Sequence, residues 1–253
     1  MDFLEKILVE KRKEVAQMPL EEVTNHTQGA SFYQTVRNHP ERIHVIGEIK
    51  RASPSKGAIN LEVDILDQAQ QYQAAGVSAI SVLTDEVFFK GQLQDLADIA
   101  ATVSVPVLCK DFVISEKQLI RAKNAGASLV LLIVAALSRE ELQTLYTKAQ
   151  ALQLEVLVEA HNAEELQTAK DIGAKIIGIN NRDLKTFIVD IDHSVQLTQP
   201  QEDIVYVSES GFATAEDVQR ITKGFHAVLV GETLMRATSP REKIVELRVK
   251  RHG

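Results

Sequence analysis

A glutamate and a lysine stand two residues apart at the end of an apolar segment, residues 44–49. Because successive side chains of a β-strand point to opposite faces, Glu48 and Lys50 would share one face and Ile49 the other. Burying a carboxylate beside an ammonium group is costly, so such a pair is expected to be solvated or functional. A proline follows at Ser53-Pro54 and ends the strand, because it holds the preceding residue extended. This charged strand tip is the first candidate for acid–base chemistry.

Polar residues also follow other apolar segments of the chain. They are Lys110-Asp111-Phe112, Glu159, Asn180 with Arg182, Glu209-Ser210-Gly211 and Gly231-Glu232. If the segments are parallel strands of a barrel, these side chains meet at one rim. The two lysines Lys50 and Lys110 and the two glutamates Glu48 and Glu159 would form an acid–base site there. A lysine near a second cation donates its proton more easily, and a glutamate against apolar walls is a stronger base. Structural ion pairs explain any one residue equally well, but not five strand ends at once.

The ends of the last two predicted strands contain glycine and could bind a phosphate group. They are Ser210-Gly211 and Gly231-Glu232. Barrels of parallel strands often bind phosphate on backbone amides after the last two strands, beside a short helix. Residues 233–235 are expected to form that helix ahead of Pro240. Lys50 and Arg182 would supply the positive charge that an anionic substrate needs in a chain of net charge −7.

Apolar residues near the same rim would form a wall for an aromatic ring. They are Phe88, Phe89, Phe112, Leu131 and Leu184. Most phenylalanines are core residues, but Phe89 and Phe112 lie just beyond strand ends.

Other reactive side chains are interpreted as structural. Cys109 precedes Lys110 and would face away from the rim, and His161 is interpreted as a solvated loop residue. The histidines lack metal-ligand spacing, so no metal site is expected. The basic run Lys11-Arg12-Lys13 is interpreted as the solvated face of a helix. Asp190 and Asp192 are expected to cap a helix.

The elements that position these residues follow a βα repeat. Apolar, β-branched segments recur about every 20 to 35 residues, the scale of one βα unit. They cover residues 44–49, 79–83, 105–109, 129–133, 155–158, 176–179, 204–207 and 227–230. Helical patterns separate them; Ser115 and Ser138 are expected N-caps, and Gly76, Gly126 and Gly173 are expected helix stops. No G-x-G-x-x-G follows the first strand, so a (β/α)8 TIM barrel is favoured over a doubly wound sheet.

A surplus of residues 1–43 precedes the first strand. Phe3, Ile7, Leu8, Lys11 and Val15 have helical spacing, and residues 32–36 suggest a second short helix. This N-terminal helical segment would either close the bottom of the barrel or fold over its active-site mouth, and the sequence leaves both open. With no linker or change of composition, we expect one domain over residues 1–253.

Composition narrows the classes of function. The chain has 253 residues, 45% of them hydrophobic, and a single cysteine, so no internal disulfide is expected. The net charge of −7 disfavours nucleic acid as a partner. The longest apolar run, near residues 129–137, is too short to cross a bilayer, and the N-terminus lacks the apolar region of a signal peptide. We therefore expect a cytoplasmic protein without a membrane partner.

Several of these segments together resemble the indole-3-glycerol phosphate synthase family. The matching pieces are GEIKRASPSKG, LTDEVFFKG, VLCKDFVI, VLLIVAAL, VLVEAHN, IGINNRDL, VSESGF and VLVGETLMR, in family order over about residues 44–236. The resemblance implies a carbon–carbon lyase of tryptophan biosynthesis acting on 1-(2-carboxyphenylamino)-1-deoxyribulose 5-phosphate. This small phosphorylated substrate carries an anthranilate ring. No cofactor and no metal are implied, and we expect a monomer or weak homo-oligomer.

The resemblance also implies roles for individual residues. Lys110 would be the general acid that protonates the ketone oxygen while the ring carbon bearing the carboxylate attacks, and Glu159 would be the base of the dehydration. Lys50 would steer the substrate carboxylate, and the division of the acid role between the two lysines is left open. The other matched positions are Glu48 and Asn180, to orient these groups; Ser210, to position substrate; Gly211, Gly231 and Glu232, at the phosphate; and Ser53 and Arg182, as polar contacts.

Two features depart from the family pattern. Glu232 stands where some members have serine, so its carboxylate must point away from the phosphate. Some members cover the anthranilate ring with an aromatic residue of the N-terminal helix; this chain has no tryptophan, and Leu8 is the expected substitute.

Three other functions remain open from the residues alone. A Schiff-base aldolase would use Lys110 or Lys50 as an amine nucleophile, which borohydride would trap. A sugar-phosphate isomerase would need the phosphate site but no aromatic wall. A non-catalytic binding subunit would have no reason to bury Glu48, Lys50, Lys110, Glu159 and Asn180.

Overall fold

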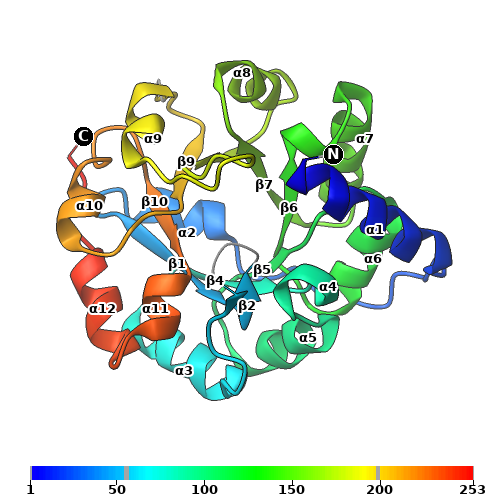
Figure 1. Ribbon diagram of the computed structural model, residues 1–253, viewed down its shortest axis with the longest axis horizontal. Helices are drawn as coiled ribbons and strands as arrows, with labels where there is room; N and C mark the ends of the chain where they lie inside the picture. Colours follow the sequence, from blue (N-terminus) through cyan, green and yellow to red (C-terminus); the bar gives the residue numbers. More distant parts are fainter. Residues whose placement is uncertain (1, 54–56, 198–199, 253) are drawn as a thin grey trace.

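The computed structural model describes residues 2–53, 57–197 and 200–252, and in them eight parallel strands close into a barrel. The barrel strands are β1 (His44–Ile49), β4 (Ala79–Leu83), β5 (Val107–Lys110), β6 (Leu129–Ile133), β7 (Glu155–Ala160), β8 (Ile176–Asn180), β9 (Val205–Glu209) and β10 (Ala227–Val230). Strand β1 pairs with both β4 and β10, which closes the ring seen end-on in Figure 1. A hairpin of β2 (Ala52–Ser53) and β3 (Gly57–Ala58) follows β1. The predicted TIM barrel is confirmed.

The strands differ from the predicted segments mainly at their carboxyl ends. Strand β9 extends to Glu209, two residues beyond the predicted end, and β5 extends to Lys110. Asn180 and Glu209 are paired in register, so both polar residues belong to the sheet and not to the loops that follow. An apolar pattern ends at the first polar residue, whereas the hydrogen-bonded ladder continues as long as the neighbouring strand does.

Helices surround the barrel and complete its hydrophobic core. They are α3 (Ile65–Ala75), α4 (Glu86–Phe89), α5 (Leu93–Thr102), α6 (Glu116–Asn124), η1 (Val134–Ala136), α7 (Arg139–Ala151), α8 (Ala163–Asp171), α9 (Ile191–Leu197), α10 (Ala215–Gln219), α11 (Glu232–Arg236) and α12 (Pro240–Leu247). Ser115 and Ser138 form the predicted N-caps, and Gly76 ends α3 in a left-handed conformation with φ of 84°. In the described part of the chain, no helix is long and apolar enough to cross a membrane.

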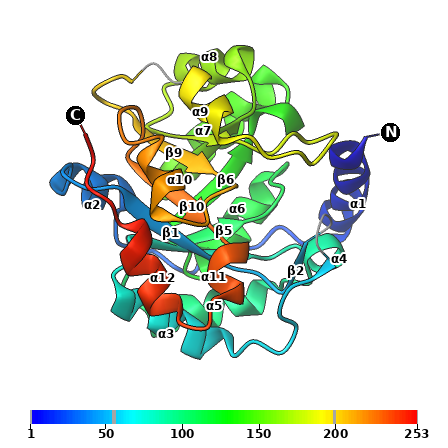
Figure 2. The same ribbon diagram turned by 60° about the vertical axis from the view of Figure 1, so that its left-hand side comes forward.

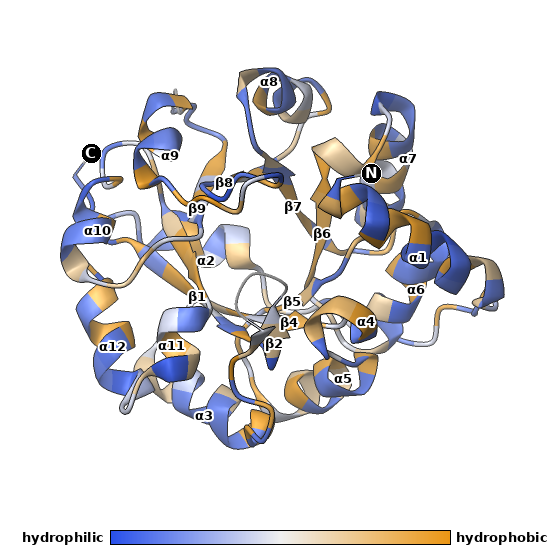
Figure 3. Ribbon diagram, in the orientation of Figure 1, coloured by the Kyte–Doolittle hydropathy of each residue, from blue (hydrophilic) through white to orange (hydrophobic). Residues whose placement is uncertain are grey.

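Alternation along each strand divides the core into two layers. Val45 and Ile49 of β1 face the helices, whereas Ile46 faces the barrel interior. Cys109 is buried in the outer layer, as predicted. Figure 3 shows hydrophobic residues concentrated on the strands, with hydrophilic residues on the outer sides of the helices. The same alternation turns Glu48, two residues after Ile46, toward the interior at the carboxyl end.

The two N-terminal helices lie at opposite ends of the barrel (Figure 2). Helix α2 (Phe32–Asn38) buries Phe32 and Val36 in the interior cluster and closes the bottom. Helix α1 (Phe3–Gln17) lies at the other end. The two alternatives for this segment are therefore both realised, one by each helix. The basic run on α1 is not uniformly solvated: Arg12 and Lys13 are exposed, but Lys11 is only 1% exposed.

Candidate active site

A cavity of about 690 Å³ opens at the carboxyl ends of the barrel strands. Parallel strands place all their carboxyl ends at one rim, so residues distant in sequence meet there. All residues assigned to the site from the sequence line this cavity, with the exception of Phe88 and Leu8. Those that line it are Glu48, Lys50, Ser53, Phe89, Lys110, Phe112, Leu131, Glu159, Asn180, Arg182, Leu184, Ser210, Gly211, Gly231 and Glu232.

Lys110 lies between two glutamates in this cavity. Its Nζ is 2.6 Å from Glu209 Oε2 and 3.3 Å from Glu159 Oε2. Burial opposes the charge on the Lys110 ammonium group, but Glu209, Glu159 and Glu48 outweigh it, and the pKa of Lys110 is raised. The expectation that a neighbouring cation would lower this pKa is wrong, because the groups that contact the amine are carboxylates.

The two glutamates around Lys110 differ in their pKa. Burial disfavours ionisation of Glu159, but Lys110, His161 and Asn180 outweigh it and lower its pKa. The expected increase in its basicity from apolar walls is therefore wrong. At Glu209 burial prevails over the opposing attraction of Lys110, and the nearby charge of Glu159 adds to it, so its pKa is raised to about 7. Of the two glutamates, Glu209 is the one whose protonated form is favoured by burial.

The sequence placed Glu209 among the residues at the rim but assigned it no role in the site. Placing the end of β9 two residues early left Glu209 in a loop. The inward alternation of Val205 and Val207, both in the interior cluster, was the signal that pointed to it.

Glu48 and Lys50 form an ion pair, with Glu48 Oε1 2.8 Å from Lys50 Nζ. Burial opposes ionisation of Glu48, but Lys50 and Lys110 prevail and its pKa is lowered. Ser81 Oγ donates a hydrogen bond of 3.4 Å to the other Glu48 oxygen. A Cβ atom at Gly231 would stand within 3.0 Å of both charged groups, so glycine leaves room for the pair.

Asn180 connects Glu159 to the loop after β9. Its Nδ2 donates to Glu159 Oε1 at 3.2 Å, and its Oδ1 accepts from Ser210 Oγ and from the Arg182 amide, both at 3.0 Å. Ser210 has a φ of 70°, a conformation that costs energy for a residue other than glycine. The Asn181 side chain donates to the Ser210 carbonyl at 3.0 Å, which helps to hold this conformation.

His161 is not a solvated loop residue, which corrects the sequence interpretation. Its ring lies between two carboxylates, with Nε2 3.1 Å from Glu159 Oε1 and Nδ1 3.1 Å from Glu165 Oε2. Burial disfavours the imidazolium, but the two glutamates prevail and raise the pKa of His161 to about 10. The imidazolium of His161 is therefore favoured next to Glu159. The position of His161 in a loop of the sequence did not indicate this contact.

One side of the cavity is apolar. The Phe89 and Phe112 rings have centroids 6.1 Å apart, and Leu131 and Leu184 line the same cavity. Phe88 instead packs edge-on against Phe3 of α1, with centroids 5.7 Å apart, and does not line it.

The loops after β9 and β10 form the opposite part of the rim. Gly211 has a φ of 100°, and the short α11 begins directly after Gly231. Thr233 Oγ1 donates to the Phe212 carbonyl at 2.8 Å and joins the two loops. The Glu232 carboxylate pairs with Arg236 at 3.2 Å, one turn further along the helix.

The chain that forms this cavity is similar in sequence to proteins of one known family. A family model described as indole-3-glycerol phosphate synthase matches residues 4–247. A protein of that name from Listeria welshimeri is 56% identical over 252 residues, 99% of this chain and all of the relative. One from Streptococcus sanguinis is 53% identical over 98% of each chain. The chain belongs to the indole-3-glycerol phosphate synthase family.

Solved structures of other proteins share the fold of this synthase family member. A thiamine phosphate pyrophosphorylase from Pyrococcus furiosus superposes with a TM-score of 0.61 at 15% identity, covering 86% of this chain and 96% of its own. The tryptophan synthase alpha chain from Legionella pneumophila gives 0.61 at 13% identity, covering 88% and 96%. At this identity the likeness shows the barrel alone.

Helix α1 contributes to the cavity of this synthase family member through residues that were not assigned to the site from the sequence. Phe3, Leu4 and Ile7 line the cavity, whereas Leu8, the expected cover for an aromatic ring, is buried but not part of the wall. Leu8 lies on the same face of α1 as these three residues. The angle at which α1 crosses the rim decides which of the side chains reach the cavity.

Proposed function

We propose that this chain closes the indole ring of 1-(2-carboxyphenylamino)-1-deoxyribulose 5-phosphate, with loss of carbon dioxide and water, to give indole-3-glycerol phosphate. The observation that carries the proposal is the position of Lys110 Nζ, 2.6 Å from Glu209 and 3.3 Å from Glu159, in a cavity with an aromatic wall. A substrate with an aromatic ring, a ketose chain and a phosphate has one part for each side of this cavity.

Ring closure begins at the charged centre. Lys110 gives a proton to the ketone oxygen while the ring carbon bearing the carboxylate attacks the ketone carbon, forming the new carbon–carbon bond. The carboxylate then leaves as carbon dioxide, and its bonding electrons restore the aromatic ring. The hydroxyl group formed from the ketone oxygen then takes a proton from a lysine ammonium group of the site and departs as water. Glu159 takes a proton from the neighbouring CH2 carbon, and the electrons of that C–H bond form the carbon–carbon double bond of the indole. The lowered pKa of Glu159 keeps its carboxylate ionised before this step.

The remaining residues bind and orient the substrate. Lys50 holds the ring carboxylate near Glu48, and Asn180 and Ser210 hold hydroxyl groups of the chain. The ring lies against four apolar side chains, and the phosphate lies at the loops after β9 and β10. The apolar set is Phe89, Phe112, Leu131 and Leu184; the phosphate set is Gly211, Gly231 and Glu232, through backbone amides, with Arg182 and Ser53 as further polar contacts.

We further propose that the enzyme works in the cytoplasm as one domain over residues 1–253, monomeric or weakly oligomeric and without nucleic acid. The net charge of −7 and the single cysteine support this. Sedimentation of the purified protein tests the oligomeric state.

The function is tested by mixing purified protein with the substrate, without added metal or nucleotide, and following indole fluorescence. A steady rise is expected. Lys110→Ala should reduce kcat by about 10²- to 10⁴-fold, the usual contribution of a positioned acid–base group. Lys50→Ala, measured beside it, shows which lysine acts as the acid. Absence of product from folded wild-type protein would refute the proposal, and a borohydride-trapped adduct would favour a Schiff-base aldolase.

A further inference from the structure

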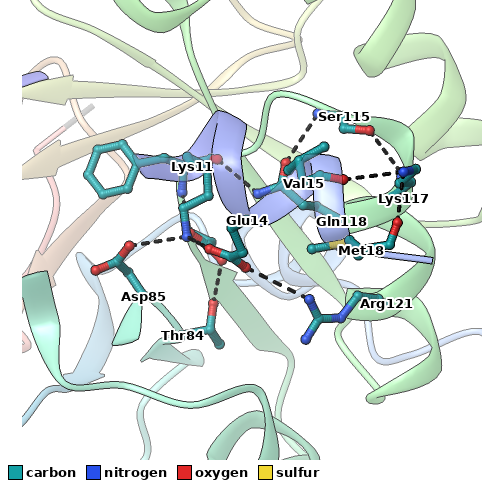
Figure 4. Close-up of polar contacts among 12 residues, drawn as sticks. Lys11, Glu14, Val15, Met18, Thr84, Asp85, Ser115, Lys117, Gln118 and Arg121 are labelled. Carbon is teal, nitrogen blue, oxygen red and sulfur yellow. Dashed lines mark hydrogen bonds and ion pairs between the residues drawn. The ribbon is translucent and has the colours of Figure 1, made fainter. Parts of the chain in front are cut away.

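One buried lysine outside the reacting centre faces three carboxylates. Lys11 Nζ lies 3.1 Å from Asp85 Oδ2 and 2.8 Å from Glu14 Oε2 (Figure 4), and 2.8 Å from Asp111 Oδ1. We call these four residues the Lys11 cluster. Lys11 is only 1% exposed, and a buried ammonium group persists only where it is well paired. A helix that merely rested on the rim would not need such a pairing.

The partners of Lys11 come from two loops of the cavity rim. Asp111 directly follows Lys110 at the end of β5, and Thr84 Oγ1 donates to its second oxygen at 3.1 Å. Asp85 follows β4 and caps α4 by accepting from the Phe88 amide at 2.7 Å. Lys11 therefore contacts both loops as well as its own helix.

Each of these loops carries one phenylalanine of the aromatic wall. The Phe112 amide donates to Asp111 Oδ1 at 2.7 Å, the same oxygen that pairs with Lys11. Phe89 belongs to α4, which Asp85 caps. The apolar residues of α1 that line the cavity lie on the turns before Lys11. The Lys11 ammonium group thus links α1 to Asp111 and Asp85. These two residues support the segments that carry Phe112 and Phe89.

Other contacts attach the carboxyl end of α1 independently. Lys117 Nζ donates to the Val15 and Met18 carbonyls at 3.2 and 2.7 Å, and Arg121 lies 3.8 Å from Glu14 (Figure 4). A variant of Lys11 should therefore keep α1 attached at this end while releasing it from the loops after β4 and β5.

We propose that Lys11 is a positioning residue for ring closure: it locks α1 onto the loops after β4 and β5 and thereby holds the aromatic wall against the anthranilate ring. This inference rests on the proposed function. Lys11 touches neither the reacting atoms nor Lys110 Nζ, so it acts through Asp111 and Asp85. Its loss removes binding that is equal in the ground and transition states, which raises KM and leaves kcat nearly unchanged.

The test compares Lys11→Met, of similar length without the charge, with Lys11→Arg and Lys13→Met. We expect Lys11→Met to raise KM by about 10-fold or more, the scale of losing one well-buried side-chain contact, with kcat within about threefold of wild type. Lys11→Arg should recover much of the affinity. Lys13, on the same helix, is 63% exposed, and its one ion pair among the described residues is with Glu10 on the surface, so Lys13→Met should match wild type.

A further variant covers the case in which Lys11→Met does not fold. Asp85→Asn keeps an oxygen to cap α4 but removes a charge that faces Lys11, and it should raise KM by about threefold or more. Unchanged KM in folded Lys11→Met, or in Asp85→Asn where that variant alone folds, would overturn the inference, as would a fall in kcat at constant KM. Wild type without turnover would refute the proposed function, and the positioning role with it.

Discussion

Gly178 is the residue at which the smallest change should disturb the catalytic centre most directly. It lies on β8 in register with Glu159, and a Cβ atom there would stand less than 3.0 Å from Glu209 Oε1. Real Cβ atoms essentially never come that close, so Gly178→Ala must displace the Glu209 carboxylate by about an ångström. Among the described residues, that oxygen has no hydrogen-bond partner, so only packing and the Lys110 contact of the other Glu209 oxygen resist the shift.

Two effects of Gly178→Ala should follow from this displacement. Moving a reacting or supporting group by about 1 Å can reduce kcat by about 10²-fold, and here the move breaks the 2.6 Å contact of Glu209 with Lys110. Overpacking a filled core costs about 1–3 kcal/mol of the free energy of unfolding. For a chain of this size that corresponds to a fall in Tm of roughly 2 to 12 °C.

The assay measures kcat by indole fluorescence and Tm by circular dichroism. Ile177→Val is the matched control: Ile177 is the neighbouring residue on β8, fully buried on the outer face. It should lose about 0.5–1.5 kcal/mol of stability with kcat unchanged. Wild-type kcat in folded Gly178→Ala would show that the position of Glu209 does not matter to the reaction and would refute this reasoning.

Two further predictions concern pH. The pKa of Glu209 is raised to about 7, and the ionised form of Glu209 is the partner of Lys110, so kcat should rise as pH increases through 7. Glu209→Gln should abolish this rise in a pH–rate profile. An unchanged profile in this variant would exclude Glu209 as the origin of the rise. At the bottom of the barrel, burial lowers the pKa of His44 to about 4 and that of His226 to about 3, so the folded state favours neutral rings. Their contribution to stability is complete above the ordinary value of 6.5 and is lost as pH falls from there toward 4, so Tm should drop over this range and drop less in His226→Gln; equal slopes in both proteins would contradict this.

Much of the fold and most of the site wall could be read from local pattern. Apolar segments at βα spacing predicted the barrel, and alternation along each strand predicted which side chains face its interior. Glu48 and Lys50 show why this worked: their spacing places them on one face of β1 wherever β1 lies. Parallel strands then bring all the carboxyl ends to one rim, so residues from every loop could be assigned to the same cavity without knowing any distance.

The amino-acid sequence by itself determined the elements, their order and the end of the barrel that carries the site, because these depend on period and polarity within a few residues. Tertiary structure alone decided which charges are buried and what faces them. Lys11 looks like any solvated lysine of an amphipathic helix until α1 meets the loops after β4 and β5. Likewise, the directions in which the pKa values of Lys110, Glu159 and His161 move depend on partners from other strands and loops. Burial and Coulomb interaction act through space, and local sequence does not encode those distances.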